Sequence, residues 1–413
     1  MTLPGAIVIG GYANGVSALR SLAREGVRTA AVLTKPHDIA HLSRYAHESH
    51  RVLDLHRRPD GLIDLLEEQG RRWRGWALIP TNDDALTALA EHRERLSRWY
   101  PPTVPEPEVV RQVTLKTNTY GAAVEVGVDL PRCYGPASRS TVTRTDIVYP
   151  VVVKPRESSR FWERFDRKLM VVRTPLELVA AINEIEAAGL AADVYDLVPG
   201  PDHLFYNYTV YLDRWGNPAA EFGFRKLRKA PSFYGVARAA EPVDVPQLRE
   251  PTLALLRKIG WRGIASAEYK LDPRDGRYRL MEVNGRCYLS HALATRCGVN
   301  YPLLSWQEHA MRRSVRASSN GWRGLWLHLH ADLLYSAVED RSDSWSWSNF
   351  ARGYMGPWVD AVWSAADPLP FMAQWLGTAR KAHREVQEGR RRETINHRLQ
   401  PMPVTGTSHG KVV

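Results

Sequence analysis

The stretch SAEYKLDPRDGRYRLMEVNGR, residues 266–286, decides the fold assignment, because it predicts two strands joined by a tight turn. Glu282 and Asn284 are two residues apart on the second strand, so their side chains leave the same face. A five-residue loop, Pro273–Arg277, would set Glu268 directly opposite Glu282, whereas a four-residue loop would separate the two carboxylates. If the two glutamates act together, the hairpin must have the register in which Glu268 lies opposite Glu282.

The side chains of this hairpin suit a metal and a phosphate. Two glutamates and an amide oxygen on an apolar strand pair would raise each other's pKa unless a cation lay between them. Mg²⁺ takes hard oxygen ligands and completes its coordination with water and nucleotide phosphates, so Glu268, Glu282 and Asn284 are the candidate metal ligands. Arg286, on the same face, can bind a phosphate or carboxylate bidentately. An ordinary amphipathic hairpin with a charged outer face would use the same residue types, and that interpretation stays open.

The first hundred residues predict alternating strands and helices. Apolar strands at Ala6–Gly10, Thr29–Leu33 and Trp76–Pro80 alternate with helices at Ser17–Glu25 and Leu62–Gln69. This order predicts β-α-β units of a parallel sheet. Four prolines within Pro101–Pro107 then indicate a linker.

Two polar turns of this region resemble ligand sites. The sequence Gly10–Gly15 follows a strand and opens a helix, as a dinucleotide-binding loop does. Tyr12 occupies the position of a required glycine, and no acidic residue follows the second strand, so a nicotinamide or flavin enzyme is not indicated. A tight turn, or a loop that closes over a small substrate, explains the glycines. In the group Thr81–Asp84, Asn82 is a good N-cap for a helix at Ala85–His92, although a substrate amine could also be held there.

The rest of the chain predicts a second region rich in strands. The predicted strands are Val148–Lys154, Met170–Arg173, Val194–Val198, Leu204–Leu212, Ala219–Leu227, Ile264–Leu271 and Tyr278–Val283, with helices at Leu115–Val126, Pro175–Ala188 and Val245–Ile259. Pro155–Lys168 is a charged segment with a hairpin-like pattern. Eight of the fourteen tryptophans lie between Trp306 and Trp375, where they pack or line a substrate pocket. Trp345 and Trp347 would face the same way in an extended stretch.

Composition excludes several classes of protein. The 413 residues are 44% hydrophobic and 24% charged, and the chain shows neither a bilayer-spanning apolar run nor a signal-peptide pattern, so we expect a cytoplasmic location. Cys133, Cys287 and Cys297 are too few and too widely spaced for a disulfide framework or a zinc site. Much of the net charge of +11 lies in 380–392, without the aromatic interleaving of an RNA-binding surface. We therefore expect neither a nucleic-acid nor a membrane partner.

Three motifs occur in a fixed order along the chain. They are Val152-Val153-Lys154-Pro155, Asp196-Leu197-Val198-Pro199-Gly200 and Glu282-Val283-Asn284-Gly285-Arg286. The set resembles the V-V-K-P, E-x-I-P-G and E-x-N-x-R patterns of the ATP-grasp superfamily, in particular its carboxylate–amine ligase branch, which is related to D-aspartate ligase and to the biotin carboxylase and carbamoyl-phosphate synthetase domains. The resemblance covers residues 116–302.

This resemblance implies an α/β (α+β ATP-grasp) architecture of several parts. They are a Rossmann-like pre-ATP-grasp domain at 1–112, an ATP-grasp N-terminal lobe with a lid at 113–190, a C-terminal lobe at 191–308, a Trp-rich helical extension at 309–400 and a disordered tail at 401–413. The lid differs from that of many relatives because it lacks glycine. Its phosphate contacts would depend on side chains such as Ser158, Ser159 and Arg160.

The resemblance also implies roles for single residues. Lys116 and Lys154 would bind the nucleotide, and Lys154 would reach its phosphates with help from Lys168. The remaining implied nucleotide contacts are the backbone of Asp196, Leu197 and Val198 at the adenine, Asp202 or His203 at the ribose, and Lys226. The implied catalytic set is Lys154, Arg225 and Arg286, which would balance charge on the transferring phosphoryl group.

The implied activity is that of an ADP-forming ligase. A carboxylate would attack the γ-phosphate of ATP with Mg²⁺ or Mn²⁺ bound, and an amine, often that of an amino acid, would displace phosphate from the acyl phosphate. Small-molecule carboxylates and amines are the implied partners, with a homodimer as the implied assembly. Two alternatives stay open: an ATP-binding regulatory module without turnover, and an ATP-grasp ligase with a different acceptor.

Overall fold

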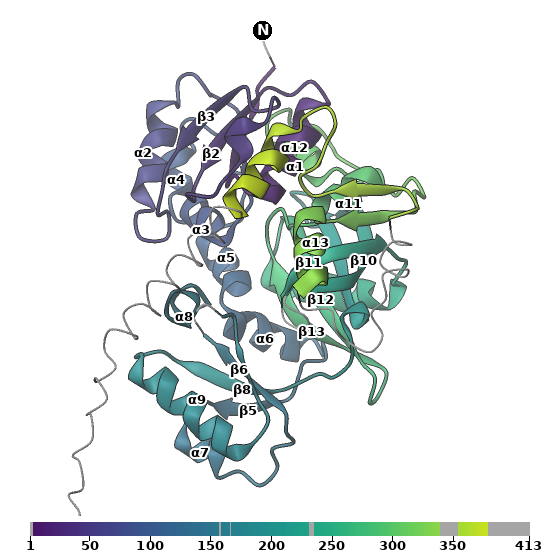
Figure 1. Ribbon diagram of the computed structural model, residues 1–413. Helices are drawn as coiled ribbons and strands as arrows, with labels where there is room; N and C mark the ends of the chain where they lie inside the picture. The colour runs from purple at the N-terminus through teal and green to yellow at the C-terminus, as the bar shows by residue number, and fades with distance from the viewer. Residues whose placement is uncertain (1–2, 157, 166, 231–234, 339–353, 379–413) are drawn as a thin grey trace, which may run out of the picture.

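The computed structural model describes residues 3–156, 158–165, 167–230, 235–338 and 354–378. Three sheets organise these residues, in the strand orders β3-β2-β1-β4, β5-β8-β6-β7 and β13-β12-β9-β10-β11-β14-β15. Figure 1 shows the first sheet above the second, with the large third sheet beside both. Among the described ranges, no helix combines the length and the apolar character that crossing a bilayer requires.

The first sheet is parallel, as its alternating pattern predicts. It consists of β1 (Ala6–Ile9), β2 (Thr29–Leu33), β3 (Glu48–Arg51) and β4 (Ala77–Pro80). The helices of this region are α1 (Ala13–Ala23), η1 (Ala40–Leu42), α2 (Asp60–Glu68), α3 (Asp83–Glu91) and α4 (Arg93–Leu96). Strand β3, with the sequence ESHR, was not predicted from the sequence, because it is a polar edge strand that alternates between half-buried and exposed residues.

Both polar turns of the first sheet have structural roles. Asn82 caps α3, and its side chain accepts a hydrogen bond of 2.8 Å from the backbone nitrogen of Ala85. Gly10 has a φ of +104°, and a Cβ atom on Gly15 would lie 2.0 Å from the carbonyl oxygen of Gly10. The glycines therefore permit a tight strand-to-helix turn, which confirms the structural interpretation of both motifs.

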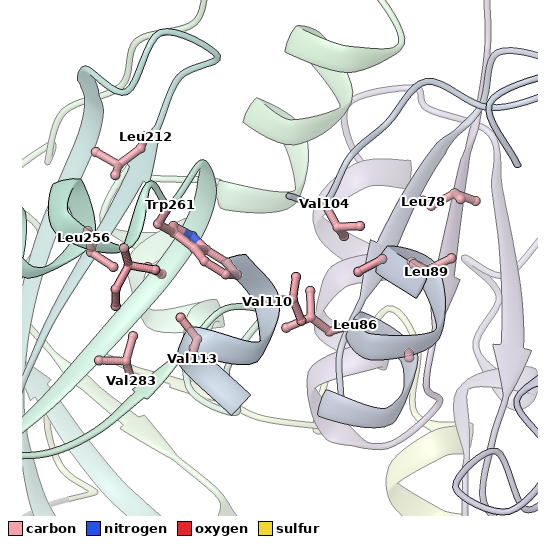
Figure 2. Close-up of a cluster of buried hydrophobic side chains, with 14 of the residues drawn as sticks. Leu78, Leu86, Leu89, Val104, Val110, Val113, Leu212, Leu256, Trp261 and Val283 are labelled. Carbon is pink, nitrogen blue, oxygen red and sulfur yellow. The ribbon is translucent and has the colours of Figure 1, made fainter. Parts of the chain in front are cut away.

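An unpredicted helix connects the first sheet to the third. The proline-rich segment leads directly into α5 (Pro107–Thr114), which is followed by α6 (Lys116–Glu125). Figure 2 shows Val110 and Val113 of α5 between Leu86 of α3 and Trp261. These side chains belong to one buried cluster that extends into the third sheet. Helix α5 thus fixes the N-terminal region against the large sheet.

The second sheet is antiparallel and forms a small lobe with its helices. It consists of β5 (Cys133–Pro136), β6 (Val151–Pro155), β7 (Met170–Val172) and β8 (Ala192–Asp196), covered by α7 (Arg139–Val142), α8 (Ser158–Phe165) and α9 (Pro175–Ala187). The hairpin-like pattern predicted for Pro155–Lys168 is wrong, because α8 forms there and buries Phe161. Strand β8 pairs with β5 and β6, so this lobe continues past residue 190, where the sequence suggested its end.

The third sheet contains the hairpin that carries Glu268 and Glu282. Its strands are β9 (Phe205–Leu212), β10 (Pro218–Ala230), β11 (Val236–Pro242), β12 (Gly263–Asp272), β13 (Arg277–Asn284), β14 (Leu325–Leu327) and β15 (Trp358–Asp360). Its helices are η2 (Asp202–Leu204), η3 (Pro246–Leu248), α10 (Arg249–Ile259), α11 (His291–Arg296), α12 (Tyr301–His309) and α13 (Leu329–Val338). All its neighbouring strands are antiparallel except β14 and β15.

The C-terminal extension is more than the helical appendage suggested by the sequence. It adds β14 and β15 to the large sheet, besides α13 and helical residues 369–378. Trp326 of β14 is completely buried, which agrees with packing as the role of that tryptophan. The pair Trp345 and Trp347, the basic segment 380–392 and the tail 401–413 lie outside the described residues.

The register of the β12–β13 hairpin combines both possibilities considered from the sequence. Asp272 pairs with Arg277, so the loop has four residues rather than five. Such a loop alone would pair Glu268 with Met281. The register shifts after Glu268, so that Met281 becomes an extra, bulged residue and Glu268 pairs with Glu282. The predicted pairing of the two glutamates is confirmed, whereas the predicted loop length is wrong.

Candidate active site

A cavity of about 210 Å³ collects the charged residues of the hairpin and of the small lobe. Lys116 at the start of α6, Lys154 on β6 and Lys168 before β7 come from one side. From the large sheet the cavity receives Lys226, Lys229, Glu268, Glu282, Asn284 and Arg286. The structure therefore brings Lys116 of α6 and two lysines of the small lobe, distant in sequence, to the three predicted metal ligands.

Glu268 is held by two lysines of the neighbouring hairpin. Its side chain is 6% exposed and accepts a hydrogen bond from Lys226 Nζ. Lys229 Nζ lies 3.8 Å from Glu268 Oε1 and 3.4 Å from the centre of the Phe205 ring. Lys229 was not among the residues predicted from the sequence.

Glu282 begins a chain of hydrogen bonds along one face of β13. Asn284 Nδ2 donates to Glu282 Oε1 at 3.1 Å, and Arg286 Nη2 donates to Asn284 Oδ1 at 3.0 Å. Burial alone would raise the pKa of Glu282, but the ammonium groups of Lys168, Lys116 and Lys226 and the Asn284 amide lower this pKa to about 2. Glu282 is therefore a carboxylate at neutral pH, ready to bind a cation.

Lys154 is buried among aromatic rings. It is 9% exposed, and its Nζ donates to Tyr120 Oη at 3.3 Å and lies 5.3 Å from the centre of the Tyr195 ring. Burial lowers the pKa of Lys154 to about 8, although the charges of Glu282 and Glu268 oppose this shift. A buried ammonium group without a directly bound carboxylate gains strongly from an anionic ligand.

The cavity reaches the N-terminal region through an ion pair. Arg286 Nε donates to Asp83 Oδ1 at 2.7 Å, so the first turn of α3 contacts the end of β13. Asp83 is half exposed. The Thr81–Asp84 turn thus lies at the edge of the site, in addition to its capping role.

Several predicted nucleotide residues do not line this cavity. Asp196 pairs with Arg274, and the Val198 carbonyl accepts a 2.8 Å hydrogen bond from Lys270 Nζ. The others outside the cavity lining are Leu197, Asp202 and His203. Their assignment to the adenine and the ribose remains a prediction.

Arg225 lies on the opposite face of β10 from the cavity. Its Nε donates to Glu241 Oε1 at 2.9 Å, and it is absent from the cavity lining, whereas its neighbour Lys226 contacts Glu268. Adjacent residues of a strand point to opposite faces, so the two predicted residues could not both enter the site. The geometry supports Lys226 in place of Arg225.

A larger cavity of about 910 Å³ lies elsewhere, between the linker and the end of α12. Arginines such as Arg74, Arg98 and Arg312 line it together with the prolines of the linker. It contains none of the residues predicted for metal or nucleotide binding. The chemistry of the lining, rather than the size of the cavity, therefore selects the smaller cavity as the candidate active site.

Comparison with known proteins shows which proteins share this fold. Residues 236–310 match the family described as carbamoyl-phosphate synthase L chain, ATP binding domain. N5-carboxyaminoimidazole synthetase from Staphylococcus aureus is a structural neighbour, with a TM-score of 0.61, 11% identity and coverage of 84% of this chain and 88% of that chain. L-amino acid ligase from Bacillus licheniformis gives a TM-score of 0.56 and 15% identity, with 75% of each chain covered. The chain shares the fold of these enzymes, as the ATP-grasp resemblance noted in its sequence implied.

The chain is also similar in sequence to one curated protein. D-aspartate ligase from Enterococcus faecium (strain Aus0004) is 23% identical over 252 residues. The match covers 57% of this chain and 58% of the length of that relative. The match therefore spans less than two thirds of the length of that ligase.

Proposed function

We propose that this chain is an ATP-dependent carboxylate–amine ligase that forms an amide or peptide bond through an acyl phosphate and releases ADP and phosphate. An amino acid is the proposed substrate, as in the names of the D-aspartate and L-amino acid ligases to which the chain is similar. The observation that carries the proposal is the charge of the 210 Å³ cavity, where six basic side chains surround two carboxylates. This excess of positive charge suits a triphosphate held next to a metal ion.

The donor atoms of the cavity fit a hard divalent cation. Glu268 and Glu282 face each other across the hairpin. Asn284, whose amide oxygen accepts from Arg286 here, would turn that oxygen to the metal. Asn207 Oδ1, on the strand that pairs with β12 at Glu268, is buried without a hydrogen-bond partner among the described residues. The described residues contain no group of three His, Cys, Asp or Glu side chains that could hold a metal. A site of two carboxylates and amide oxygens suits Mg²⁺ or Mn²⁺, which would neutralise charge on the nucleotide phosphates.

The basic residues would bind the phosphates and balance the charge of the reacting groups. Lys116, Lys154 and Lys226 would hold the phosphates, and a substrate carboxylate oxygen would attack the γ-phosphorus in line as the bond to the β-phosphate oxygen breaks. Arg286 would orient that carboxylate and offset its charge. The amine nitrogen would then attack the acyl carbon, phosphate would leave, and the amine would lose a proton. Positioning and charge balance suffice for these steps, so no protein nucleophile is required.

The small lobe would protect the intermediate from water. Lys168 reaches the cavity from the chain after α8, while Lys154 reaches it from β6. Closure of the segment 156–168 over the phosphates would exclude water until the amine arrives, because acyl phosphates hydrolyse readily.

Assembly and location belong to the same proposal. The biotin carboxylase domain of Hydrogenobacter thermophilus 2-oxoglutarate carboxylase, a neighbour with this fold, is described as a dimer. We include a homodimer in the proposal, to be measured by light scattering during gel filtration. A cytoplasmic location is also proposed, because ATP is available there.

Phosphate release tests the proposed function. Purified protein with MgATP is screened against pools of amino acids and other carboxylates, and the screen is repeated with Glu282→Ala. Release that depends on both a particular pool and Glu282 is the expected result. ATP binding without turnover in any pool would favour a regulatory module. Phosphate release that depends on a thiol or on bicarbonate would favour a ligase with another acceptor. The absence of ATP binding would refute the proposal.

A further inference from the structure

The β10–β11 hairpin departs from regular pairing next to the cavity. Leu227 is an extra residue on β10, and Arg238 is an extra residue on β11. Lys226 and Lys229 are three positions apart and would face opposite sides of a regular strand. Because Leu227 bulges, both ammonium groups reach Glu268. The pairs that define this register are Lys226 with Ala240, Arg228 with Ala239, and Lys229 with Ala237.

The C-terminal extension binds the outer side of this irregular segment. Arg228 donates from Nε and Nη2 to the two carboxylate oxygens of Asp332, at 2.8 and 2.6 Å. Asp332 belongs to α13 and is completely buried, and the Tyr354 hydroxyl donates to it at 2.6 Å. Figure 1 shows α13 lying across β10 and β11.

Arg238, the bulged residue of β11, also holds this irregular segment in place. Arg238 is 2% exposed, and its Nε donates to the carbonyl oxygen of Lys229 at 3.0 Å. Its Nη1 donates to Ser336 Oγ at 2.8 Å and lies 3.5 Å from Asp332. A bulge distorts the strand locally, and here the Arg238 side chain ties β11 to the backbone at Lys229. The buried charge of Asp332 balances the two arginines that hold the bulge.

We propose that Asp332 is a positioning residue of the nucleotide site and that Lys229 is a further phosphate-binding residue. Asp332 fixes Arg228 and Arg238, these arginines fix the backbone at Lys229, and the Lys229 ammonium group is thereby turned toward the phosphates beside Glu268. The C-terminal extension is then part of the site, although it touches no reacting atom. This inference rests on the ATP binding proposed above.

Calorimetric titration of the full-length chain with ADP and Mg²⁺ tests the inference. Lys229→Met and Asp332→Asn should each weaken ADP binding by about tenfold, a change of about 1.4 kcal/mol. The double variant should bind no more than about twofold more weakly than Lys229→Met, because Asp332 acts through Lys229. Asp367→Asn is the matched control, since Asp367 is an equally buried carboxylate of the extension that pairs with Arg20 of the N-terminal region. Its ADP affinity should equal that of the wild type.

Two results would overturn the inference while leaving the proposed function intact. One is an equal loss of affinity in Asp332→Asn and Asp367→Asn, and the other is full additivity in the double variant. If Asp332→Asn does not fold, Tyr354→Phe is the substitute, because it removes one hydrogen bond from the same carboxylate. It should weaken ADP binding about threefold in the wild-type background and have no effect in the Lys229→Met background. An unchanged ADP affinity in Tyr354→Phe would contradict the inference. A wild-type chain that binds no ADP refutes the proposed function and the inference with it.

Discussion

Glu268 faces Glu282 across the hairpin because Met281 is displaced from the strand ladder between them. The Tyr120 hydroxyl donates to the Met281 carbonyl oxygen at 2.8 Å, and the backbone nitrogen of Leu280 donates to the carbonyl oxygen of Asp129 at 2.8 Å. Contacts with α6 and the chain that follows it therefore hold the bulge. The metal-site register depends on these tertiary contacts as well as on the turn.

Tyr120→Phe should disturb the paired glutamates. It leaves the Met281 carbonyl without its donor, which should lower the free energy of unfolding by about 1–2 kcal/mol and weaken Mn²⁺ binding several-fold. Urea unfolding and Mn²⁺ titration by electron paramagnetic resonance measure the two effects. Tyr195→Phe is the control, because its ring also lies near Lys154 but does not contact the bulge. Equal metal affinity in both variants would contradict the role of Tyr120.

Glu282→Gln should reduce the proposed ligase turnover by at least about 10²-fold, because the carboxylate proposed to hold the metal is replaced by a neutral amide. The comparison variant is Glu241→Gln, which alters the partner of Arg225 outside the cavity. Its turnover should stay within about threefold of the wild type. Phosphate release at saturating MgATP is the measurement, and comparable losses in the two variants would argue against a metal at Glu282.

The sequence predicted those parts of the fold that depend on local pattern. The apolar strands of the first sheet, the Asn82 cap and the same-face placement of Glu282 and Asn284 all follow from residue spacing, and the structure confirms them. The edge strand β3 lacks an apolar pattern, and α8 lies in a charged segment whose pattern resembled a hairpin.

The residues of the candidate site were harder to predict where a β-bulge changes the face of the strand on which the following side chains lie. Lys229 faces the cavity only because Leu227 is an extra residue, and Glu268 meets Glu282 only because Met281 is one. A bulge depends on tertiary partners such as Arg238, so its position is not encoded in the local alternation of side chains. Arg225 was predicted together with Lys226 from the resemblance, although the alternation of side chains along one strand places these neighbours on opposite faces.

Substitutions of these two neighbours should therefore have unequal effects. Lys226→Met removes the ammonium group that contacts Glu268 and faces the cavity, and should reduce turnover by about 10²-fold. Arg225→Met breaks a partly exposed pair with Glu241 and should reduce turnover by less than about threefold. Rates of phosphate release at saturating ATP and substrate compare the variants. A larger loss in Arg225→Met would restore the role that the sequence suggested for it.

Nucleotide affinity should fall as pH rises through about 8. Burial lowers the pKa of Lys154 to about 8, so in the free protein its ammonium group loses a proton over the range from pH 7 to 9. A neutral amine attracts phosphate less, and the dissociation constant for ADP should rise across this range. In Lys154→Arg the guanidinium stays charged, so the rise should be smaller. An identical pH dependence in the wild type and this variant would exclude Lys154 as its source.

Acid should destabilise the fold before its carboxylates are protonated, because His328 and His291 are buried as neutral rings. Burial lowers the pKa of each to about 4. The unfolded chain binds protons at these histidines below pH 6.5, whereas the folded chain does not until about pH 4, so stability falls as pH decreases through this window. At pH 5 each histidine should reduce the free energy of unfolding by about 2 kcal/mol relative to pH 7. Urea unfolding at both values measures the loss, and His328→Gln should remove about half of the histidine contribution; an unchanged pH dependence in this variant would show that His328 is protonated within the fold.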